Sequence, residues 1–457
     1  MIKQWHKRHL TELGKIMIAK TFLLSQFTFI LQALAPPDHI LNQIDKLIFG
    51  FIWQKQHSDK KAIDKIKRTV LCQELEEGGL KMISIKDQHK VFLLKWLKKL
   101  NPGENNIFPK LATFYLRSLG DIKYLTRVKF KNVEKTILKN VPCSHFWKRF
   151  VSAWWEFNSD QTITDSESLN IHILNQPIFF NPNIRYKKKT LFIERWIKKG
   201  ILFISDIVNI NGLNNLETIA TKLDSLPANE VLNYNAVINA IPQAWKISLQ
   251  TIQKATLDSI TENEIMLPKH TDIVINGSNK NLRLYLVKNK GETATCVNSW
   301  REHANVDIIP FFSIIKYIRE SKLKMLHYKI LHNIYPTNIT LYNMKIKNTR
   351  NCEICHVVDS LSHFFVKCTA LTGFWNYIQA WIYRKLDLRL KLTTTDILLG
   401  ILPVNNHEIT MLNIKKVNEV ILIGKQCINK MKYGNQHNIT ILFDTEIHLR
   451  HNNDEDV

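Results

Sequence analysis

Residues 311–336 read FFSIIKYIRESKLKMLHYKILHNIYP. Apolar side chains recur every three or four residues along this stretch, which is the spacing that gathers them on one face of an α-helix. These apolar residues are Phe312, Ile315, Ile318, Met325, Leu326 and Ile330. Basic residues lie between them, namely Lys316, Arg319, Lys322, Lys324 and Lys329. The pattern predicts a basic amphipathic helix over 311–333, and Pro336 ends it because proline cannot donate a backbone hydrogen bond.

Helical patterns continue on both sides of this stretch, so the chain is expected to be mainly α-helical. Further helices are predicted at 10–33, 38–53, 86–100, 145–157, 190–200, 228–239, 369–390 and 408–432. The 457 residues include 14 glycines and 13 prolines, whereas a β-sandwich or barrel needs many tight turns. One short β-hairpin is expected in the middle of the chain, within 273–286, where Asn276-Gly277 is a common hairpin turn.

The length of the chain allows about two to four domains. The helical patterns and turn residues divide it into three regions. The first, 1–103, contains a turn at Gly78-Gly79, the second, 104–305, is a connecting helical region, and the third is 306–457.

Four potential metal ligands follow Pro336 in the pattern C-x2-C-x7-H-x4-C: Cys352, Cys355, His363 and Cys368. Two thiolates separated by two residues can bind one ion from a single tight turn, and the His–Cys pair can complete a tetrahedron. Four protein ligands leave no open position, so the spacing predicts one structural Zn²⁺ in a CCHC knuckle. His356 is an alternative ligand, although His363 gives the more regular spacing.

Positive charge dominates the composition, with 63 Lys and Arg against 40 Asp and Glu and a formal net charge of +23. Such an excess attracts polyanions through counterion release. Basic and aromatic residues also alternate at Arg185, Tyr186, Lys187, Lys188 and Lys189. The expected partners are therefore RNA and/or DNA, with no small-molecule substrate. The sequence leaves the oligomeric state and the choice between RNA and DNA open.

The largely apolar run from Ile16 to Ala35 resembles a targeting signal. Polar residues such as Lys20 and Gln26 interrupt it, and a long segment precedes it, so a buried amphipathic helix is the favoured interpretation. No membrane partner is expected. Seven cysteines, three of them in the knuckle, indicate a reducing compartment, cytoplasmic and/or nuclear rather than secretory.

No catalytic constellation is evident in the sequence. A polymerase palm needs clustered carboxylates for two metal ions, and the chain has no Asp-Asp pair. Asp444, Glu446 and His448 alternate along one stretch, which suggests a strand face in a mobile tail. The aromatic residues Phe364, Phe365, Phe374 and Trp375 could stack on bases, but packing around a zinc-held core is the more usual role. The chain is therefore not expected to be an enzyme.

The sequence around the knuckle resembles the C-terminal part of LINE-type non-LTR retrotransposon reverse transcriptases. The resembling stretch is YKILHNIYPTN at 328–338, then the four ligands, then Phe374-Trp375. The first hundred residues resemble the region after the polymerase palm in the same family, through Gly14-Lys15-Ile16, Pro36-Pro37, Ile52-Trp53 and Gly78-Gly79-Leu80. The middle resembles it through Trp196, Gly200-Ile201, Ile204-Ser205-Asp206 and Ile241-Pro242-Gln243-Ala244-Trp245.

This resemblance implies a fragment: a thumb-like start, a connecting region and a zinc-binding end, with the palm and the endonuclease expected upstream of Met1. It implies binding of RNA or an RNA–DNA hybrid during target-primed reverse transcription, without catalysis by this chain. The candidate contacts are the five basic residues of the 311–333 helix and the basic residues of 185–189. The alternative is a decayed or repurposed zinc-containing interaction module that binds no nucleic acid.

Overall fold

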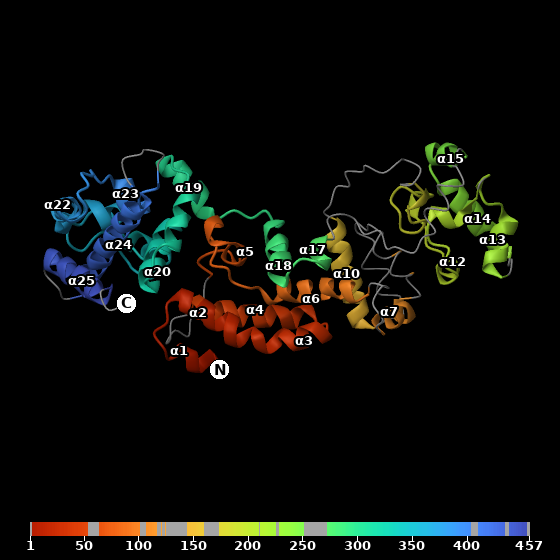
Figure 1. The fold of residues 1–457 in the computed structure, drawn as a ribbon, viewed down its shortest axis with the longest axis horizontal. Coiled ribbons are helices and arrows are strands. Elements are labelled where there is room, and N and C mark those ends of the chain that lie inside the picture. The colour runs from red at the N-terminus through yellow and green to blue at the C-terminus, as the bar shows by residue number, and fades with distance from the viewer. Residues whose placement is uncertain are drawn as a thin grey trace. The chain divides into compact units, whose positions relative to one another are not determined.

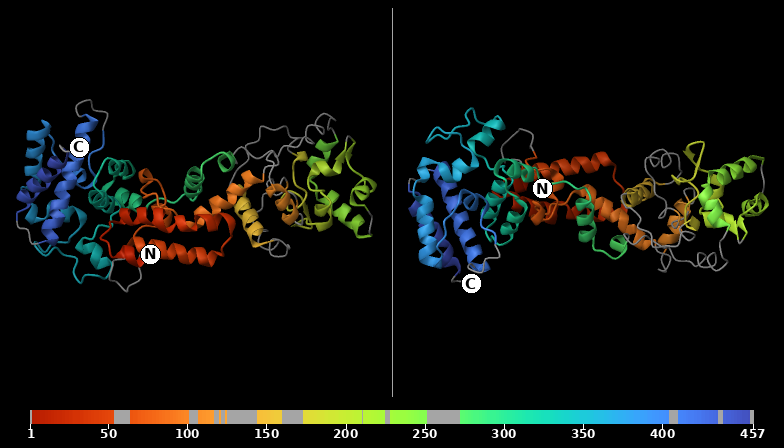
Figure 2. Two further views of the ribbon diagram at one scale, coloured as in Figure 1. Left: turned by 60° about the horizontal axis from the view of Figure 1, so that its bottom comes forward. Right: turned by 90° about the horizontal axis from the view of Figure 1, so that it is seen from above.

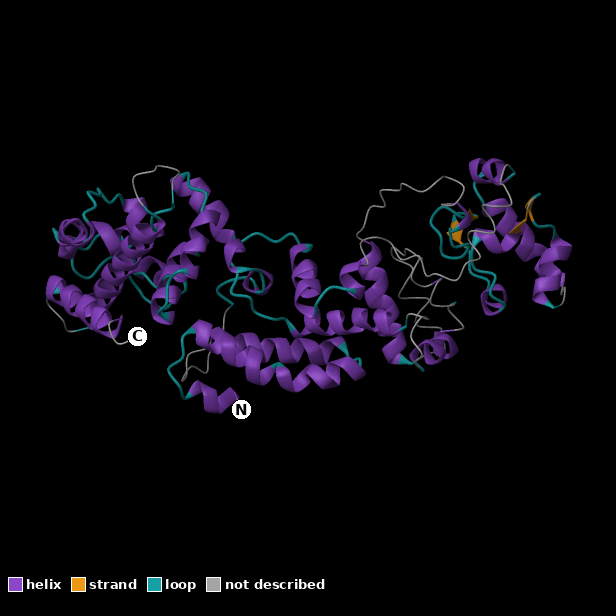
Figure 3. Ribbon diagram, in the orientation of Figure 1, coloured by secondary structure: helices purple, strands orange, loops and turns teal. Residues whose placement is uncertain are grey.

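A computed structural model describes the protein at residues 2–53, 64–100, 107–116, 120, 124, 144–159, 173–209, 211–224, 228–250, 272–403, 410–434 and 438–454. Helices dominate these ranges, and the named strands form two small antiparallel sheets (Figure 1, Figure 3). The mainly α-helical prediction is confirmed. The chain divides into two compact units, each built from segments that are separate in sequence.

Unit 1 comprises 1–27, 38–85 and 284–457. Its helices are α1 (Ile2–His6), α2 (Glu12–Ile18), α4 (Asp38–Trp53), α5 (Arg68–Leu71), α19 (Thr295–Ala304), α20 (Ser321–Leu331), α21 (Asn338–Asn343), α22 (Phe374–Leu386), α23 (Thr394–Leu399), α24 (Met411–Tyr433) and α25 (Ile439–Asp454). Short 3₁₀ or π turns cover Ala19–Leu23, Ser25–Phe27, Leu75–Glu77, Ile309–Lys316, His363–Lys367 and Thr369–Leu371.

Unit 2 comprises 28–37 and 86–283. Its helices are α3 (Thr28–Ala33), α6 (Ile85–Lys99), α7 (Phe108–Leu116), α10 (His145–Ser159), α12 (Glu194–Lys198), α13 (Leu216–Leu223), α14 (Ala228–Ala240), α15 (Gln243–Leu249) and α17 (Asp272–Ile275); α18 (Asn279–Lys288) continues into unit 1. β1 (Arg185–Tyr186) pairs with β2 (Lys189–Thr190), and β3 (Val208–Asn209) with β4 (Gly212–Leu213). The three regions predicted from sequence stay a prediction, and the predicted boundary at 103 lies outside the described residues.

The long helix α24 forms the centre of the C-terminal part of unit 1. It packs against α20, α22 and α25, and Figure 2 shows the blue helices of this part lying side by side. Its residues 420–425 are all buried. Gly424 permits the close approach of α22, because a Cβ there would lie 2.6 Å from Cδ1 of Ile378. The helix predicted at 408–432 is thus confirmed.

The remaining predicted helices are mostly present. α4 has the predicted bounds, and α6, α10 and α14 lie within two or three residues of theirs. The predicted 190–200 helix is shorter, as α12, and the predicted 369–390 helix is a 3₁₀ turn followed by α22. Aromatic rings dominate the packing in unit 2, where Trp96 of α6 lies 5.2 Å from Phe108 and 5.1 Å from Phe146, measured between ring centroids.

The single helix predicted over 311–333 is wrong, because two helices occupy this stretch. A 3₁₀ helix spans Ile309–Lys316, and α20 begins only at Ser321, after extended backbone at Glu320. The physical reason lies in the spacing. Phe312, Ile315 and Ile318 recur every three residues, which suits the 3₁₀ period rather than the α-helical one. All three side chains are buried.

The β-hairpin predicted within 273–286 is also wrong, because α17 and α18 occupy this stretch. Asn276-Gly277 does form a turn, but one between helices: the Asn276 N–H donates to the Asp272 carbonyl, 2.8 Å away. Ser278 then caps α18 by accepting a hydrogen bond from the Asn281 N–H. The expected short hairpin in the middle of the chain exists instead as β1–β2 and β3–β4.

The apolar run near the N-terminus is helical but only partly buried. α2, the turns at Ala19–Leu23 and Ser25–Phe27, and α3 follow one another, and α2 packs along α4 (Figure 2). Among the described residues, Glu12–Ala33 is long and apolar enough to cross a membrane by length and composition, and 28% of its apolar window is buried. Ile16 and Leu23 lie in the core, whereas Met17 and Phe22 are half exposed.

The predicted turn at Gly78-Gly79 holds separate segments of unit 1 together. Gly78 has a φ of +85°, and its carbonyl accepts hydrogen bonds from the Tyr328 hydroxyl at 2.9 Å and from Nε2 of His332 at 2.8 Å. Because Nε2 carries the proton, Nδ1 of His332 is an acceptor, and the Cys296 Sγ lies 3.6 Å from it. Gly79 admits no Cβ, since one would lie 2.1 Å from the Gln73 carbonyl oxygen.

Candidate metal centre and basic surfaces

Two short backbone turns bring the four predicted ligands together. Asn351 and Val358 form an isolated antiparallel bridge, and inside it the Cys352 N–H donates to the Val357 carbonyl at 2.7 Å. This turn orients Cys352 and Cys355. The π turn His363–Lys367 leads to Cys368, whose N–H donates to the His363 carbonyl at 3.0 Å. Both pairs of ligands are therefore positioned by backbone hydrogen bonds close to them in sequence.

The ligand atoms lie at the spacing of a tetrahedral metal site. All four lie within 4.8 Å of one another. The Cys352 and Cys355 sulfurs lie 3.9 and 3.8 Å from that of Cys368, and Cys355 Sγ lies 3.1 Å from His363 Nε2. Two thiolates bound at about 2.3 Å to one tetrahedral ion are about 3.8 Å apart. A disulfide needs about 2.05 Å, so the cluster fits a metal ion better than a disulfide.

The burial of the cluster matches a closed structural site. Cys352, His363 and Cys368 are buried and Cys355 is half buried, whereas the alternative ligand His356 is exposed and lies outside the cluster. Burial raises the pKa of the Cys368 thiol to about 11. Burial, and then the charge of Lys432, lower the pKa of His363, so its ring is neutral and can offer a lone pair to a metal.

Cys355 differs from Cys368 in its proton affinity. Burial acts to raise the pKa of the Cys355 thiol, but hydrogen bonds involving the Thr369 backbone and the Cys352 and Cys368 side chains outweigh it, and the pKa lies below its ordinary value. A thiol that loses its proton more easily is a better metal ligand.

Lys432 provides an independent indication of a negatively charged centre. Its Nζ is buried, forms no hydrogen bond with the described residues, and lies 4.1 Å from the centroid of the Phe364 ring. A buried ammonium group without an acceptor is costly. Three thiolates and a divalent ion would carry a net charge of about −1, which a nearby ammonium compensates. The residues present therefore fit a bound metal ion.

The aromatic residues near the knuckle belong to the core. Phe364, Phe365, Phe374 and Trp375 are all buried, and the Trp375 Nε1–H donates to the Phe365 carbonyl at 2.7 Å. The prediction that these four side chains pack in the core, rather than stack on bases, is confirmed.

A set of hydrogen bonds next to the knuckle was not identified from the sequence. The buried Asp359 accepts a hydrogen bond from the Asn338 N–H at 3.1 Å, and the Asn338 side chain donates to the Asn351 carbonyl at 2.7 Å. These bonds join the start of α21 to the turn that carries Cys352. Thr337 caps α21, and a threonine directly after a proline was the available signal for that helix start.

The five basic residues predicted on one helix have different surroundings. Lys316 forms an ion pair with Glu76, and Lys329 forms one with Glu12 across 2.6 Å. Lys324 is half buried, while Lys322 and Arg319 are exposed. The structure therefore does not bring these five residues onto one exposed face.

The residues of the basic stretch 185–189 are all exposed, on the β1–β2 hairpin. Lys187 and Lys188 form its tight turn with φ values of +50° and +68°, as a two-residue hairpin requires. The Lys187 Nζ lies 5.4 Å from the centroid of the Tyr186 ring. These cations lie on a surface hairpin in unit 2 and are accessible to a polyanion.

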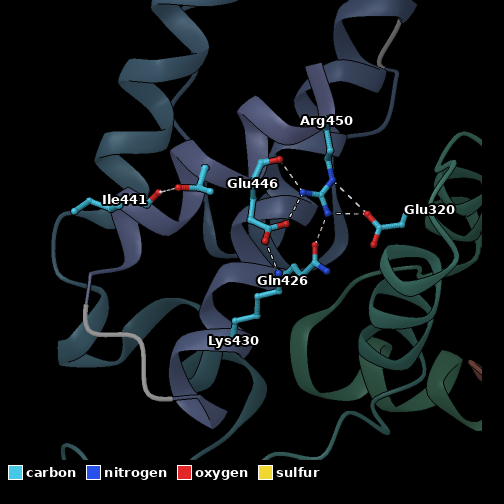
Figure 4. Close-up of polar contacts among 7 residues, drawn as sticks. Glu320, Gln426, Lys430, Ile441, Glu446 and Arg450 are labelled. Atoms are coloured by element: carbon cyan, nitrogen blue, oxygen red, sulfur yellow. Dashed lines mark hydrogen bonds and ion pairs between the residues drawn. The ribbon is translucent and has the colours of Figure 1, made fainter. Parts of the chain in front are cut away.

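Asp444, Glu446 and His448 lie on helix α25, so the predicted strand face is wrong. Glu446 is buried, and the Arg450 guanidinium donates to it at 2.6 Å and to Glu320 at 2.7 Å (Figure 4). Gln426 of α24 accepts a further bond from Arg450 at 2.8 Å, and Lys430 also pairs with Glu446. The strand prediction followed the alternation of 444, 446 and 448 and overlooked Glu446 and Arg450, which are four residues apart and pair along one helix face. The third partner, Glu320, is far away in sequence.

Comparison with known proteins finds a limited similarity. No family model matches the chain. A segment of 123 residues is 25% identical to a putative ribonuclease H protein of Arabidopsis thaliana. This segment amounts to 26% of the chain and 20% of the relative, so the similarity is weak and partial.

Proposed function

We propose that the chain is a nucleic-acid-binding segment of a retroelement protein, similar to the C-terminal part of a LINE-type reverse transcriptase. The observation that carries this proposal is the metal-ligand cluster Cys352, Cys355, His363 and Cys368, which follows the 328–338 stretch after the short helix α21. Weak similarity to a ribonuclease H protein supports a nucleic-acid-related origin. The segment would hold RNA or an RNA–DNA hybrid during target-primed reverse transcription, in the cytoplasm and/or nucleus, and contribute binding rather than catalysis.

The proposed ion is a single Zn²⁺. Three thiolates and one imidazole are the donors that zinc prefers in structural sites, and magnesium or calcium would need oxygen ligands. When bound, zinc supplies a fixed tetrahedral link between the Cys352–Cys355 turn and the His363–Cys368 turn. It would thereby order the loop between α21 and α22.

Two separate groups of exposed cations, one in each unit, are proposed to contact nucleic acid. The β1–β2 hairpin offers Arg185 and Lys187–Lys189, and the start of α20 offers Lys322 with Arg319 nearby. Lys329 is better assigned to structure, because it is half buried and pairs with Glu12 of α2. Lys316 can still bind a phosphate, because its exposed ion pair with Glu76 contributes only about 0–1 kcal/mol to stability and is easily broken.

Binding to single-stranded RNA, DNA and an RNA–DNA hybrid should be measured at about 50 mM and about 200 mM salt, because attraction to phosphates weakens steeply over this range. Replacing Lys187, Lys188 and Lys189 with glutamine should weaken binding. It should also reduce the salt slope, the steepness with which log K falls with log salt concentration, by about one unit for each lysine that binds a phosphate in the wild-type protein. Lys280, Lys385 and Lys391 are exposed and give a matched triple glutamine control. Absence of binding at low salt with zinc present would favour the alternative, a repurposed interaction module.

The metal assignment has a separate test. Wild-type protein should contain one equivalent of zinc, and the double variant Cys352→Ser, Cys355→Ser should contain almost none. Cys72→Ala is the control, because Cys72 is a buried cysteine outside the cluster. A full equivalent of zinc in the double variant would refute the ligand assignment.

A further inference from the structure

An apolar pocket surrounded by lysines lies in unit 1, between α2, the Gly78-Gly79 turn and α20. Its cavity volume is about 130 Å³, and it is partly open to solvent. Its walls are almost entirely apolar, formed by Leu13, Leu75, Leu80, Ile315, Met325 and Tyr328. Three lysines complete the lining: Lys81, Lys316 and Lys324. Below, these nine residues are called the lysine-lined pocket.

The three ammonium groups can all reach an anion at the pocket. The Lys324 side chain forms no ion pair or hydrogen bond with the residues that the structure describes. Lys81 pairs with Glu74, and Lys316 with Glu76, but the side chains of both lysines are 45–47% exposed. Exposed pairs of this kind contribute little to stability, so a phosphate can replace the glutamate with little loss.

The shape and charge of the pocket favour a nucleotide over a side chain of a protein partner. An apolar cavity next to several cations suits a planar base with a phosphate on each side. An acidic peptide would place one carboxylate beside one apolar side chain and would leave the other lysines unused. Bases in a duplex are stacked and paired and cannot enter a pocket, whereas those of a single strand are available.

We propose that the lysine-lined pocket takes one unstacked base of a single-stranded nucleic acid, with the flanking phosphates on Lys81, Lys316 and Lys324. This inference rests on the proposed nucleic-acid binding and adds a site that distinguishes single strands from duplexes. The base packs against Leu13 and Leu75, whose side chains are half buried, while the fully buried Tyr328 keeps its hydroxyl bonded to the Gly78 carbonyl.

The test compares two probes of equal charge: an oligothymidylate of about 15 nucleotides and an abasic oligomer of the same length. The wild-type chain should bind the oligothymidylate roughly tenfold more tightly, because the abasic oligomer offers no base to bury or stack in the pocket. Leu75 is half buried at the pocket, so Leu75→Trp should fill the pocket and abolish the difference between the probes. Leu13→Phe is a second filling variant, and circular dichroism checks that each variant is folded.

The lysine side chains at the pocket have a matched control. Lys324→Gln should weaken binding of both probes several-fold and lower the salt slope by about one unit. Lys385→Gln removes the same charge from another helix of unit 1, α22, and Lys385 is exposed and does not line the pocket. It should therefore have the smaller effect.

Two results would overturn the inference while leaving the proposed function intact. The first is that the wild-type chain binds both probes measurably and with equal affinity. The second is that both filling variants are folded and still prefer the oligothymidylate to the abasic oligomer as strongly as the wild-type chain does. If no oligonucleotide binds, duplex included, the proposed function fails together with the pocket. Binding of an acidic, leucine-containing peptide that Leu75→Trp abolishes, without oligonucleotide binding, would assign the pocket to a protein partner.

Discussion

Lys425 is a buried ammonium group that should reduce the stability of the protein at neutral pH. Its side chain on α24 is fully buried, and Nζ donates a hydrogen bond to the Leu398 carbonyl at 2.9 Å. The ring of His327 on α20 is also fully buried and has no hydrogen bond with the described residues. Burial lowers the pKa of His327, and the charge of Lys425 lowers it further. Burial alone accounts for the lowered pKa of Lys425, and no carboxylate of the described residues opposes it.

The cost follows from the change in proton affinity. Burial lowers the pKa of Lys425 from an ordinary 10.5 to about 7. At about 1.4 kcal/mol for each pKa unit, this is about 5 kcal/mol as an order of magnitude. Since the folded pKa is the lower one, the unfolded chain binds more protons between about pH 7 and 10.5, and stability rises with pH across this window. Below pH 7 Lys425 is charged in both the folded and the unfolded chain, so the full cost of burying its charge reduces stability.

Replacing Lys425 with methionine should therefore stabilise the protein most at low pH. At pH 6 the variant escapes the cost of about 5 kcal/mol but leaves the Leu398 carbonyl without a partner, at about 1–3 kcal/mol. A net gain of about 2–4 kcal/mol is expected at pH 6, and none at pH 10.

Thermal unfolding midpoints at pH 6 and at pH 10 measure this difference. Lys416→Met is the control, because Lys416 is exposed on the same helix and should change stability by less than about 0.5 kcal/mol. Equal destabilisation of Lys425→Met at both pH values would refute the reasoning, since it would mean that the folded protein holds Lys425 without an electrostatic cost.

Three further predictions concern the metal centre and the helix packing. Lys432→Met should weaken zinc binding about tenfold, as loss of outer-shell partners commonly does, whereas Lys432→Arg should retain most of the affinity. Chelator competition measures the zinc affinity of both variants. Equal zinc affinities of Lys432→Met and the wild-type protein would contradict charge compensation by Lys432. Gly424→Ala should lower the unfolding midpoint by the equivalent of about 1–3 kcal/mol because its Cβ would collide with Ile378. Gly50→Ala, with no atom within 4 Å of the new Cβ, should be neutral or slightly stabilising, and a similar loss in both variants would argue against the packing explanation. Glu446→Gln should destabilise the protein at pH 7, because bonds from Lys430 and Arg450 hold the pKa of Glu446 below its ordinary value despite burial. The loss of stability relative to the wild-type protein should therefore shrink as pH falls below about 4.5. A loss of stability that does not depend on pH would exclude an ionic origin.

Features set by neighbours in sequence were predictable. The spacing of Cys352, Cys355, His363 and Cys368 depends on two tight turns, and the structure brings the four residues together. The helix over 38–53 has a strong apolar stripe and forms with the expected bounds. In both cases the controlling interactions are hydrogen bonds and packing within one or two turns of chain.

Features set by distant partners were not predictable. Lys316 and Lys329 looked like parts of one basic face, but their partners Glu76 and Glu12 lie more than two hundred residues earlier in the chain. Likewise, nothing near Arg450 in sequence indicates Glu320 as its partner. Helix breaks such as that between Lys316 and Ser321 depend on which surface each apolar side chain covers, and periodicity does not determine this.

The shared carbonyl of Gly78 has a consequence for how the protein is made. Tyr328 and His332 bond to a residue about 250 positions earlier, so unit 1 cannot complete its core until its last segments leave the ribosome. At about 5–20 residues per second, synthesis of the intervening chain takes roughly 10–50 seconds. During that interval the surface of α2 that packs against α20 lacks its partner. Unit 1 therefore folds late in synthesis, and its nascent N-terminal segments are expected to be clients of chaperones.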